Sequence, residues 1–183
     1  PRHRTAETIG RRAPRGYERG RYSHGEQHQA RVEILLENID YPVDWQYIRE
    51  YNRIIGEGLV RDAGRLREYG VRIGGTGWVP EIPAVESSRE RVRGILEESE
   101  GEDTAMLLFG AVTRGQWFSD GNKRTALMVA NHQLIHDGIG VFSIPPEDKA
   151  QFVSMLLRYY ETGDYSRLSD WLSQTPSAMC PAG

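Results

Sequence analysis

The sequence predicts a mainly α-helical domain that is interrupted by one short β-hairpin. Two observations support this fold class. Along most of the chain, polar residues that can cap a helix are followed by apolar residues at helical spacing. Residues 71–83 differ, because β-branched residues flank a glycine-rich turn there. Hydrophobic residues make up 38% and charged residues 27% of the chain, which is typical of a soluble globular protein and not of a disordered or fibrous one.

Two helices are expected in the N-terminal third of the chain. Ser23 and Glu26 have the spacing of a capping box at the start of the first. Asp44 can cap the second, which should end near Gly56 and Gly58. Apolar residues recur at helical spacing in both, namely Val32, Leu35, Leu36, Ile39, Tyr47, Ile48, Tyr51, Ile54 and Ile55.

The segment 71–83 has the sequence of a short hairpin, with glycines at its turn. Pro80 and Pro83 lack a backbone N–H that could pair with a neighbouring strand. Strand pairing should therefore stop on the side of the hairpin that carries these prolines.

Three helices are expected in the middle of the chain. Ser87 and Glu90 form another capping-box pattern, and Asp103 can start a helix that ends near Arg114. A strongly apolar helix should run from residue 124 to about residue 137, where a glycine follows. Because of its apolar character, this helix is expected at the centre of the domain.

Two further helices are expected before the C-terminus. Pro145 and Pro146 introduce the first of them. The second, a short helix, should contain Leu168, Trp171 and Leu172. The sum is a helical bundle.

These elements form one expected domain over residues 23–175, between an N-terminal arm at 1–22 and a C-terminal tail at 176–183. The arm holds seven arginines and two glutamates, a net charge of +5, which leaves −8 on the remainder of a chain whose total is −3. A basic arm could bind nucleic acid or an acidic partner. A solvated, mobile terminus is the commoner explanation, so nucleic-acid binding ranks last.

The sequence gives limited information about the cellular location and the oligomeric state of the protein. No apolar run reaches the roughly 18 residues that span a bilayer, so no membrane partner is expected. The first residues lack the apolar core of a secretory signal, and the single cysteine, Cys180, excludes a disulfide within one chain. We therefore expect a cytoplasmic protein. A homo-oligomer is compatible with the sequence, which does not fix the oligomeric state.

The segment most informative about function is the loop 118–124, which leads into the expected central helix. Backbone N–H groups at a helix N-terminus lack intrahelical partners, so the position favours an anion such as phosphate. Gly121 lets the backbone approach a ligand closely, and Asn122 can donate through its amide. Lys123 and Arg124 add two positive charges, and the arginine can grip phosphate with two hydrogen bonds.

Asp120 would repel a phosphate unless a divalent cation lay between them. Mg²⁺ commonly bridges one or two carboxylates to substrate phosphates. The loop therefore predicts Mg²⁺ at Asp120 together with ATP or another nucleotide. An ordinary turn before a solvated helix start explains the same residues equally well from their spacing alone. Phe118 is expected in the core, where it would hold the loop rigid.

This loop resembles the signature of the Fic/Doc (Fido) family, His-x-Phe-x-Asp/Glu-Gly-Asn-x-Arg-x-x-Arg. The residues that match, in register, are Phe118, Asp120, Gly121, Asn122 and Arg124. The resemblance covers roughly residues 44–173 and implies a Fic-like helical bundle. Members of the family transfer AMP, or less often another phosphate-containing group, to a protein hydroxyl, whereas Doc toxins transfer the γ-phosphate.

Upstream, residues 74–83 are similar to the hairpin with which the family aligns its substrate, called the flap. The resemblance implies that Ile73, Gly75, Thr76 and Trp78 align an extended acceptor by main-chain pairing. Trp78 could equally be a core residue that fixes the hairpin.

Gln116 stands where the family has the histidine that deprotonates the attacking hydroxyl. An amide can form hydrogen bonds but cannot accept that proton. Loss of a general base typically lowers the rate by about two to four orders of magnitude. His132 and His136 lie at least two turns into the central helix, so we expect them to be packing or surface residues.

Leu127 replaces the final arginine of the signature, which holds the nucleotide's phosphates in AMP-transferring members. Lys123 resembles the lysine of Doc and favours phosphate handling unlike plain AMP transfer, whereas Gly121 remains like the AMP-transferring members.

Two functions follow from these residues. The first is a transferase that moves a nucleotidyl or phosphoryl group from a Mg²⁺-bound nucleotide to a protein or small-molecule acceptor. Its acceptor would already be ionised, and Gln116 would orient it without deprotonating it. The alternative is a catalytically silent Fic-like module that binds a nucleotide or a partner.

Overall fold

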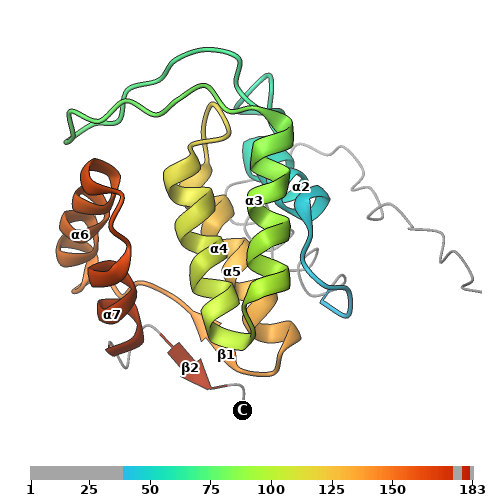
Figure 1. Ribbon diagram of the computed structural model, residues 1–183, viewed down its shortest axis with the longest axis vertical. Helices are drawn as coiled ribbons and strands as arrows, with labels where there is room; N and C mark the ends of the chain where they lie inside the picture. The colour runs from blue at the N-terminus through green and yellow to red at the C-terminus, as the bar shows by residue number, and fades with distance from the viewer. Residues whose placement is uncertain (1–38, 175–178, 182–183) are drawn as a thin grey trace, which may run out of the picture.

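The computed structural model describes residues 39–174 and 179–181. These residues form a mainly helical domain, as the sequence predicts (Figure 1). Its helices are α2 (Trp45–Gly56), α3 (Val85–Glu98), α4 (Gly101–Gly115), α5 (Asn122–His136), α6 (Lys149–Thr162) and α7 (Ser166–Gln174), and its strands are β1 (Gly140–Phe142) and β2 (Met179–Pro181). The arm 1–22 and the helix expected to begin at Ser23 lie outside the described residues.

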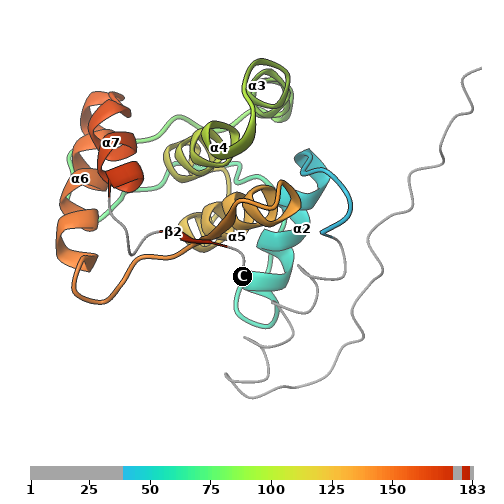
Figure 2. The same cartoon turned by 90° about the horizontal axis from the view of Figure 1, so that it is seen from below.

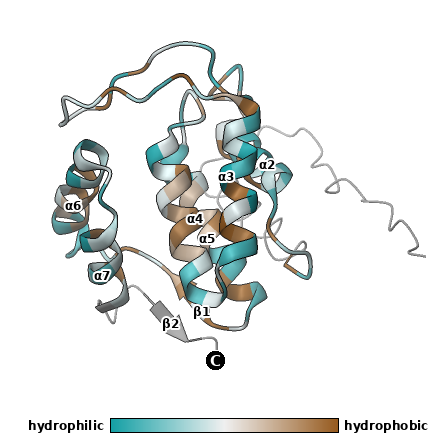
Figure 3. Cartoon of the chain, in the orientation of Figure 1, coloured by the Kyte–Doolittle hydropathy of each residue, from teal (hydrophilic) through white to brown (hydrophobic). Residues whose placement is uncertain are grey.

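Helix α5 lies at the centre of the domain. Ala126, Val129, Ala130 and Leu134 of this helix are fully buried. Helix α4 packs along it, α3 lies on the far side of α4, and α6 with α7 forms a separate pair at one side (Figure 2). Apolar residues are concentrated on α4 and α5 in Figure 3, as expected of the two helices that carry the core.

Two of the helix-boundary predictions have opposite outcomes. Asp44 caps α2 as predicted, because its Oδ1 accepts hydrogen bonds from the N–H groups of Gln46 (2.8 Å) and Tyr47 (3.0 Å). The capping box at Ser87 is wrong. The backbone is still extended at Ala84 and α3 begins directly after it, so Ser87 lies inside the first turn and its hydroxyl donates to the Ala84 carbonyl (3.3 Å).

Strand β2 pairs antiparallel with β1, with Val141 opposite Cys180. These residues belong to the segment 176–183 that was expected as a tail. The pairing places residues 179–181 beside the strand that directly follows the central helix.

The segment 71–83, which we call the flap, contains no strand, so the predicted hairpin ladder is wrong. A turn at Gly74 and Gly75 joins two extended arms that cross one end of the helical bundle (Figure 1). Pro80 and Pro83 cannot donate backbone hydrogen bonds, as the sequence indicated, and this limits pairing along one arm.

A buried arginine joins the ends of the two arms in place of a ladder. The guanidinium of Arg67 donates to the carbonyl of Tyr69 (2.6 Å), at the start of one arm, and to the carbonyl of Glu81, on the other. These two carbonyls accept from a side chain, and no ladder joins the two arms.

None of the helices within the described part of the chain combines the length and the apolar character that a membrane crossing requires.

Candidate functional site

The candidate site begins at Gln116, directly after α4. Its backbone is left-handed (φ 43°, ψ 47°), and it is the only residue other than glycine with positive φ in the described chain. Such a conformation costs about 1–3 kcal/mol and persists only where the surroundings impose it. Strained positions of this kind cluster at functional sites. The position that departs from the family signature is therefore also the strained one.

The side chain of Gln116 is held from two directions. Its Nε2 donates to the Thr113 carbonyl (2.6 Å) and, at 3.4 Å, to the hydroxyl of Tyr160. Its Oε1 accepts from Nδ2 of Asn122 (3.3 Å). Burial raises the pKa of Tyr160, so this hydroxyl stays protonated at neutral pH. Neither Gln116 nor Tyr160 can therefore act as a base.

Asn122 closes the loop between α4 and α5. Its Oδ1 accepts from the N–H of Phe118 (3.0 Å), and its Nδ2 donates to the carbonyl of the same residue (2.8 Å). Phe118 is buried, as expected of a core anchor. The Asn122 amide, a predicted phosphate donor, is in this structure used within the loop.

Asn52 of α2 is a site residue that sequence reasoning missed. Its buried Nδ2 donates to the Asp120 carbonyl (2.8 Å) and to the hydroxyl of Thr125 (3.1 Å). Its Oδ1 accepts from the N–H of Gly64 (2.9 Å). A polar residue within an otherwise apolar helix face, next to Tyr51, was the signal that could have revealed it.

Arg67 is the second missed residue. It is 1% exposed, and no carboxylate of the described residues forms an ion pair with it. Besides its bonds to the flap, its Nε donates to the Gln116 carbonyl (2.6 Å), and its backbone N–H donates to the Trp117 carbonyl (2.9 Å). Burial lowers the pKa of Arg67, although a guanidinium remains charged in proteins. One side chain thus joins the flap to the loop.

Gly121 brings the loop close to α2. Its φ is +79°, and a Cβ added there would lie 3.0 Å from Cγ2 of Ile55 and 3.2 Å from Nδ2 of Asn52. Both the backbone conformation and the limited space favour glycine at this position.

A pocket of ≈ 180 Å³ opens over the start of α5. It is lined by Gln116, Ser119, Asp120, Gly121, Asn122, Lys123 and Arg124. The fold therefore brings together the six loop residues that the sequence singled out. The pocket is smaller than the roughly 300–1,000 Å³ of typical ligand sites, so it suits the phosphates of a nucleotide better than the whole molecule.

The charged groups of this pocket lie at its mouth. Asp120 accepts from the N–H of Gly121 (2.6 Å) through Oδ1 and from the Arg124 guanidinium (3.2 Å) through Oδ2. Both partners of this ion pair are exposed, as is Lys123. With two cations, one carboxylate and a helix N-terminus, the pocket attracts anions.

The donor set fits a magnesium ion that is completed by phosphate. Asp120 is the one carboxylate among the lining residues. Nowhere in the described chain do three His, Cys, Asp or Glu side chains gather as an all-protein metal site would require. Mg²⁺ usually takes one or two carboxylates and fills its other positions with water and substrate phosphates. An exposed Asp120 at the pocket mouth satisfies that requirement.

Of the predicted flap residues, Gly75, Thr76 and Trp78 lie against α6, and neither these three nor Ile73 line the pocket. At the flap tip, a Cβ on Gly75 would come within 3.0 Å of Leu157. The hydroxyl of Thr76 donates to Glu161 (3.1 Å). Ile73 is partly buried against the core. The structure thus gathers the loop residues into one pocket and keeps the flap residues on a neighbouring helix.

Trp78 also holds the flap against α6. Its ring stacks on Tyr160 with centroids 5.6 Å apart, and the guanidinium of Arg114 lies 4.8 Å from its centroid. Arg114 also donates to the carbonyl of Tyr159 (3.2 Å), near the end of α6. The flap, α4 and α6 therefore meet at this tryptophan.

Leu127 and the two histidines of α5 lie outside the pocket. Leu127 is partly buried against the core. His132 is fully buried: its Nε2 donates to the Tyr41 carbonyl (2.8 Å), and its Nδ1 accepts from the hydroxyl of Tyr51 (2.6 Å). Burial lowers the pKa of His132. It is thus a packing residue and His136 an exposed one, as expected.

No protein-family model and no curated protein matches the sequence. Several solved structures resemble the fold. Fic-1 from C. elegans (residues 134 to 508) has a TM-score of 0.68 and 18% identity, over 81% of this chain and 46% of that one. BepC, a VirB-translocated effector from Bartonella tribocorum with bound AMPPNP, has a TM-score of 0.63 and 13% identity, over 87% of each chain.

A Fic domain containing signaling protein from Bacteroides thetaiotaomicron VPI-5482 has a TM-score of 0.58 and 22% identity, over 72% of this chain and 54% of that one. The chain thus spans about half the length of two of these three proteins. At sequence identities of 13% to 22%, the similarity to these structures shows the fold alone. The chain has the fold of Fic domain proteins.

Proposed function

We propose that this protein is a Fic-like transferase, which moves a nucleotidyl or phosphoryl group from a Mg²⁺-bound nucleotide to an acceptor without a histidine base. The observation that carries the proposal is the pocket of ≈ 180 Å³ in which the anion-binding residues meet at the start of α5. The Fic-like fold supports it, since one structure of that fold holds AMPPNP.

Four residues of the pocket, Asp120, Gly121, Lys123 and Arg124, have roles that their positions support. Lys123 and Arg124 bind phosphate oxygens together with the N–H groups at the start of α5. Gly121 allows the close approach. Asp120 would hold Mg²⁺, for which it must release Arg124, and the freed guanidinium becomes available to phosphate. Mg²⁺, when bound, supplies neutralisation of the charge on the transferred and leaving groups.

The absence of a base at position 116 sets the class of acceptor. Gln116 cannot remove a proton, so the attacking group must already be ionised near neutral pH, as a carboxylate or a phosphate is. Its oxygen forms the new bond to phosphorus while the bond to the leaving group breaks. The leaving group, pyrophosphate or a nucleoside diphosphate, takes the electron pair, and no proton is released. Gln116 orients the acceptor through its amide.

Labelled nucleotides test the proposal directly. The protein is incubated with Mg²⁺, cell extract and small metabolites, together with ATP or CTP labelled in the α- or the γ-phosphate. Transfer of α-label alone identifies nucleotidyl transfer, and transfer of γ-label identifies phosphoryl transfer. Measurable nucleotide binding without transfer to any acceptor would argue against catalysis.

A silent binding module is the second candidate, and two contacts favour it. The Gln116 amide is engaged with Thr113 and Asn122, and Asp120 is paired with Arg124 across the pocket mouth. Both contacts leave fewer groups free for a reacting substrate.

The variant Gln116→His separates the two candidates. If the wild-type protein binds nucleotide without transfer and the variant transfers to a hydroxyl, the native protein is a binding module. If calorimetry detects no Mg²⁺-nucleotide binding to either form, neither candidate survives.

A further inference from the structure

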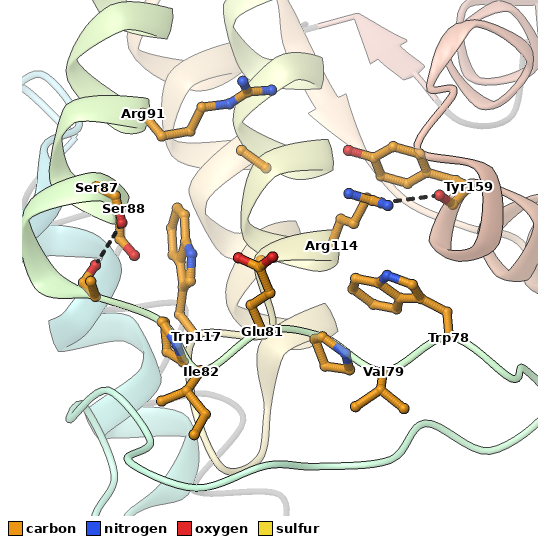
Figure 4. A pocket seen from close by; sticks show the side chains of 15 residues that line it. Trp78, Val79, Glu81, Ile82, Ser87, Ser88, Arg91, Arg114, Trp117 and Tyr159 are labelled. Carbon is orange, nitrogen blue, oxygen red and sulfur yellow. Dashed lines mark hydrogen bonds between the residues drawn. The ribbon is translucent and has the colours of Figure 1, made fainter.

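A second and larger cavity lies beneath the flap, on the side of α3. It measures ≈ 640 Å³ and is bounded by the outgoing arm of the flap, the start of α3, the end of α4 and one residue of α6 (Figure 4). None of its lining residues lines the pocket over α5. Its volume falls within the roughly 300–1,000 Å³ range of small-molecule sites.

Two nearly buried side chains line this cavity with unused hydrogen-bond donors. Ser88 is 4% exposed and Trp117 is 5% exposed. Neither the hydroxyl of Ser88 nor the indole N–H of Trp117 has a hydrogen-bond partner within the described residues, and neither atom is sealed from solvent. Polar groups this buried normally have partners. As far as the described residues go, both donors are therefore available to a group that enters the cavity.

Positive charge comes from two walls of the same cavity. Arg91 extends from α3 and Arg114 from the last turn of α4 (Figure 4). Arg91 forms no ion pair within the described chain, and Arg114 is held in place by the Tyr159 carbonyl and by Trp78. The first turn of α3 adds N–H groups, because no side chain caps this helix.

One carboxylate opposes these cations. Glu81 is exposed on the flap, and its carboxylate points into the cavity in Figure 4. It lies beyond 4.0 Å from the nitrogens of Arg91 and Arg114, since no ion pair joins them in the described residues. The side-chain donors of the cavity therefore outnumber its carboxylates. Glu81 competes for those donors with any anion that enters the cavity.

We propose that this cavity binds the phosphate group of a small phosphate monoester. A phosphate presents three strong acceptor oxygens, and α3, α4 and the residue after α4 each place a donor on the wall of this cavity. Its charge of about −2 competes well with a single carboxylate. The cavity is larger than a bare ion requires, and Pro80 and Pro83 give an apolar wall for the body of the ester.

Calorimetry with phenyl phosphate and with inorganic phosphate tests this site on the full chain. Arg91→Gln should weaken phenyl phosphate binding about tenfold or more, as loss of a charged hydrogen bond does, and Ser88→Ala should weaken it severalfold. Glu81→Gln should tighten binding, because it removes the competing charge. Phenyl phosphate should bind more tightly than inorganic phosphate.

Two control variants locate the binding. Arg93→Gln removes the same charge from α3, but Arg93 does not line the cavity and has Glu90 and Glu97 beside it, so binding should stay unchanged. Arg124→Gln alters the pocket over α5, so it should weaken only phosphate binding at that pocket, and the binding that Arg91→Gln weakens should remain.

Three results would overturn the inference. The first is that phenyl phosphate does not bind at millimolar concentration. The second is that Arg91→Gln and Arg93→Gln weaken its binding equally. The third is that Arg124→Gln alone weakens its binding. The last would assign the phosphate to the pocket over α5 and leave the proposed transferase intact. Thermal unfolding of each variant checks that a loss of binding does not reflect loss of the fold.

Discussion

The loop at residues 116–122 and the flap at residues 71–83 differ in how they are held. The loop is fixed by hydrogen bonds from Asn52, Asn122 and Arg67, and it contains a strained residue that those bonds maintain. The flap has no ladder and rests on α6 through a few side chains. The difference indicates that the pocket over α5 is formed in advance, whereas the tip of the flap is held only by side-chain contacts with α6.

Arg67→Met should have the largest effect, because Arg67 is the one side chain of the described residues that bonds to both regions. It would leave the carbonyls of Tyr69, Glu81 and Gln116 without their donor. At about 1.5–3 kcal/mol for each hydrogen bond made by a charged group, we expect a loss of about 3 kcal/mol or more in the free energy of unfolding, measured with urea. Arg72→Met, on the exposed flap, is the control, and an equal change in both variants would contradict the role of Arg67.

Gly121→Ala should affect the loop alone. The added Cβ meets Ile55 and Asn52 and takes a left-handed backbone, so we expect a loss of about 1–2 kcal/mol in stability. Gly138→Ala also has positive φ, but its Cβ would meet nothing within 4 Å, so the difference between the two variants isolates the clash. If both lose the same stability, the close approach of the loop to α2 has no energetic consequence.

Trp78→Ala should release the flap and leave the loop in place. Loss of the stacking on Tyr160 and the contact with Arg114 should cost about 0.5–1.5 kcal/mol beyond the lost burial. Hydrogen exchange should become faster across the flap and stay unchanged in the loop. Equal acceleration in both would show that the two regions are one cooperative unit.

His132 lies outside both regions and gives the smallest expected effect. Burial lowers the pKa of His132, so in acid the side chain takes up a proton more readily in the unfolded chain than in the folded one. Stability is complete above the unfolded pKa of about 6.5 and falls as the pH drops below it, by at most about 1.4 kcal/mol per pH unit. Urea unfolding at pH 7.5 and 5.5 measures this loss, which should shrink in His132→Gln.

What the sequence could predict depended on how local each feature is. The cap at Asp44 and the sequence of residues 118–124 are continuous in the chain, so the helical fold and the contents of the anion pocket could be inferred directly. Asn52 and Arg67 contact partners 68 and 49 residues away, which periodicity cannot reveal. The hairpin prediction failed at residues 71–83, where the Glu81 carbonyl accepts from the Arg67 guanidinium and Pro80 and Pro83 have no N–H to donate.

The hydrogen bonds of Arg67 have a mechanical consequence for the proposed reaction. A guanidinium is planar and rigid, so its three nitrogens move as one body. A displacement of the flap that pulls on the Tyr69 or Glu81 carbonyl is therefore transmitted to the Gln116 carbonyl, where the backbone is already strained. An acceptor that docks on the flap would thus shift the backbone at residue 116 without contacting that residue.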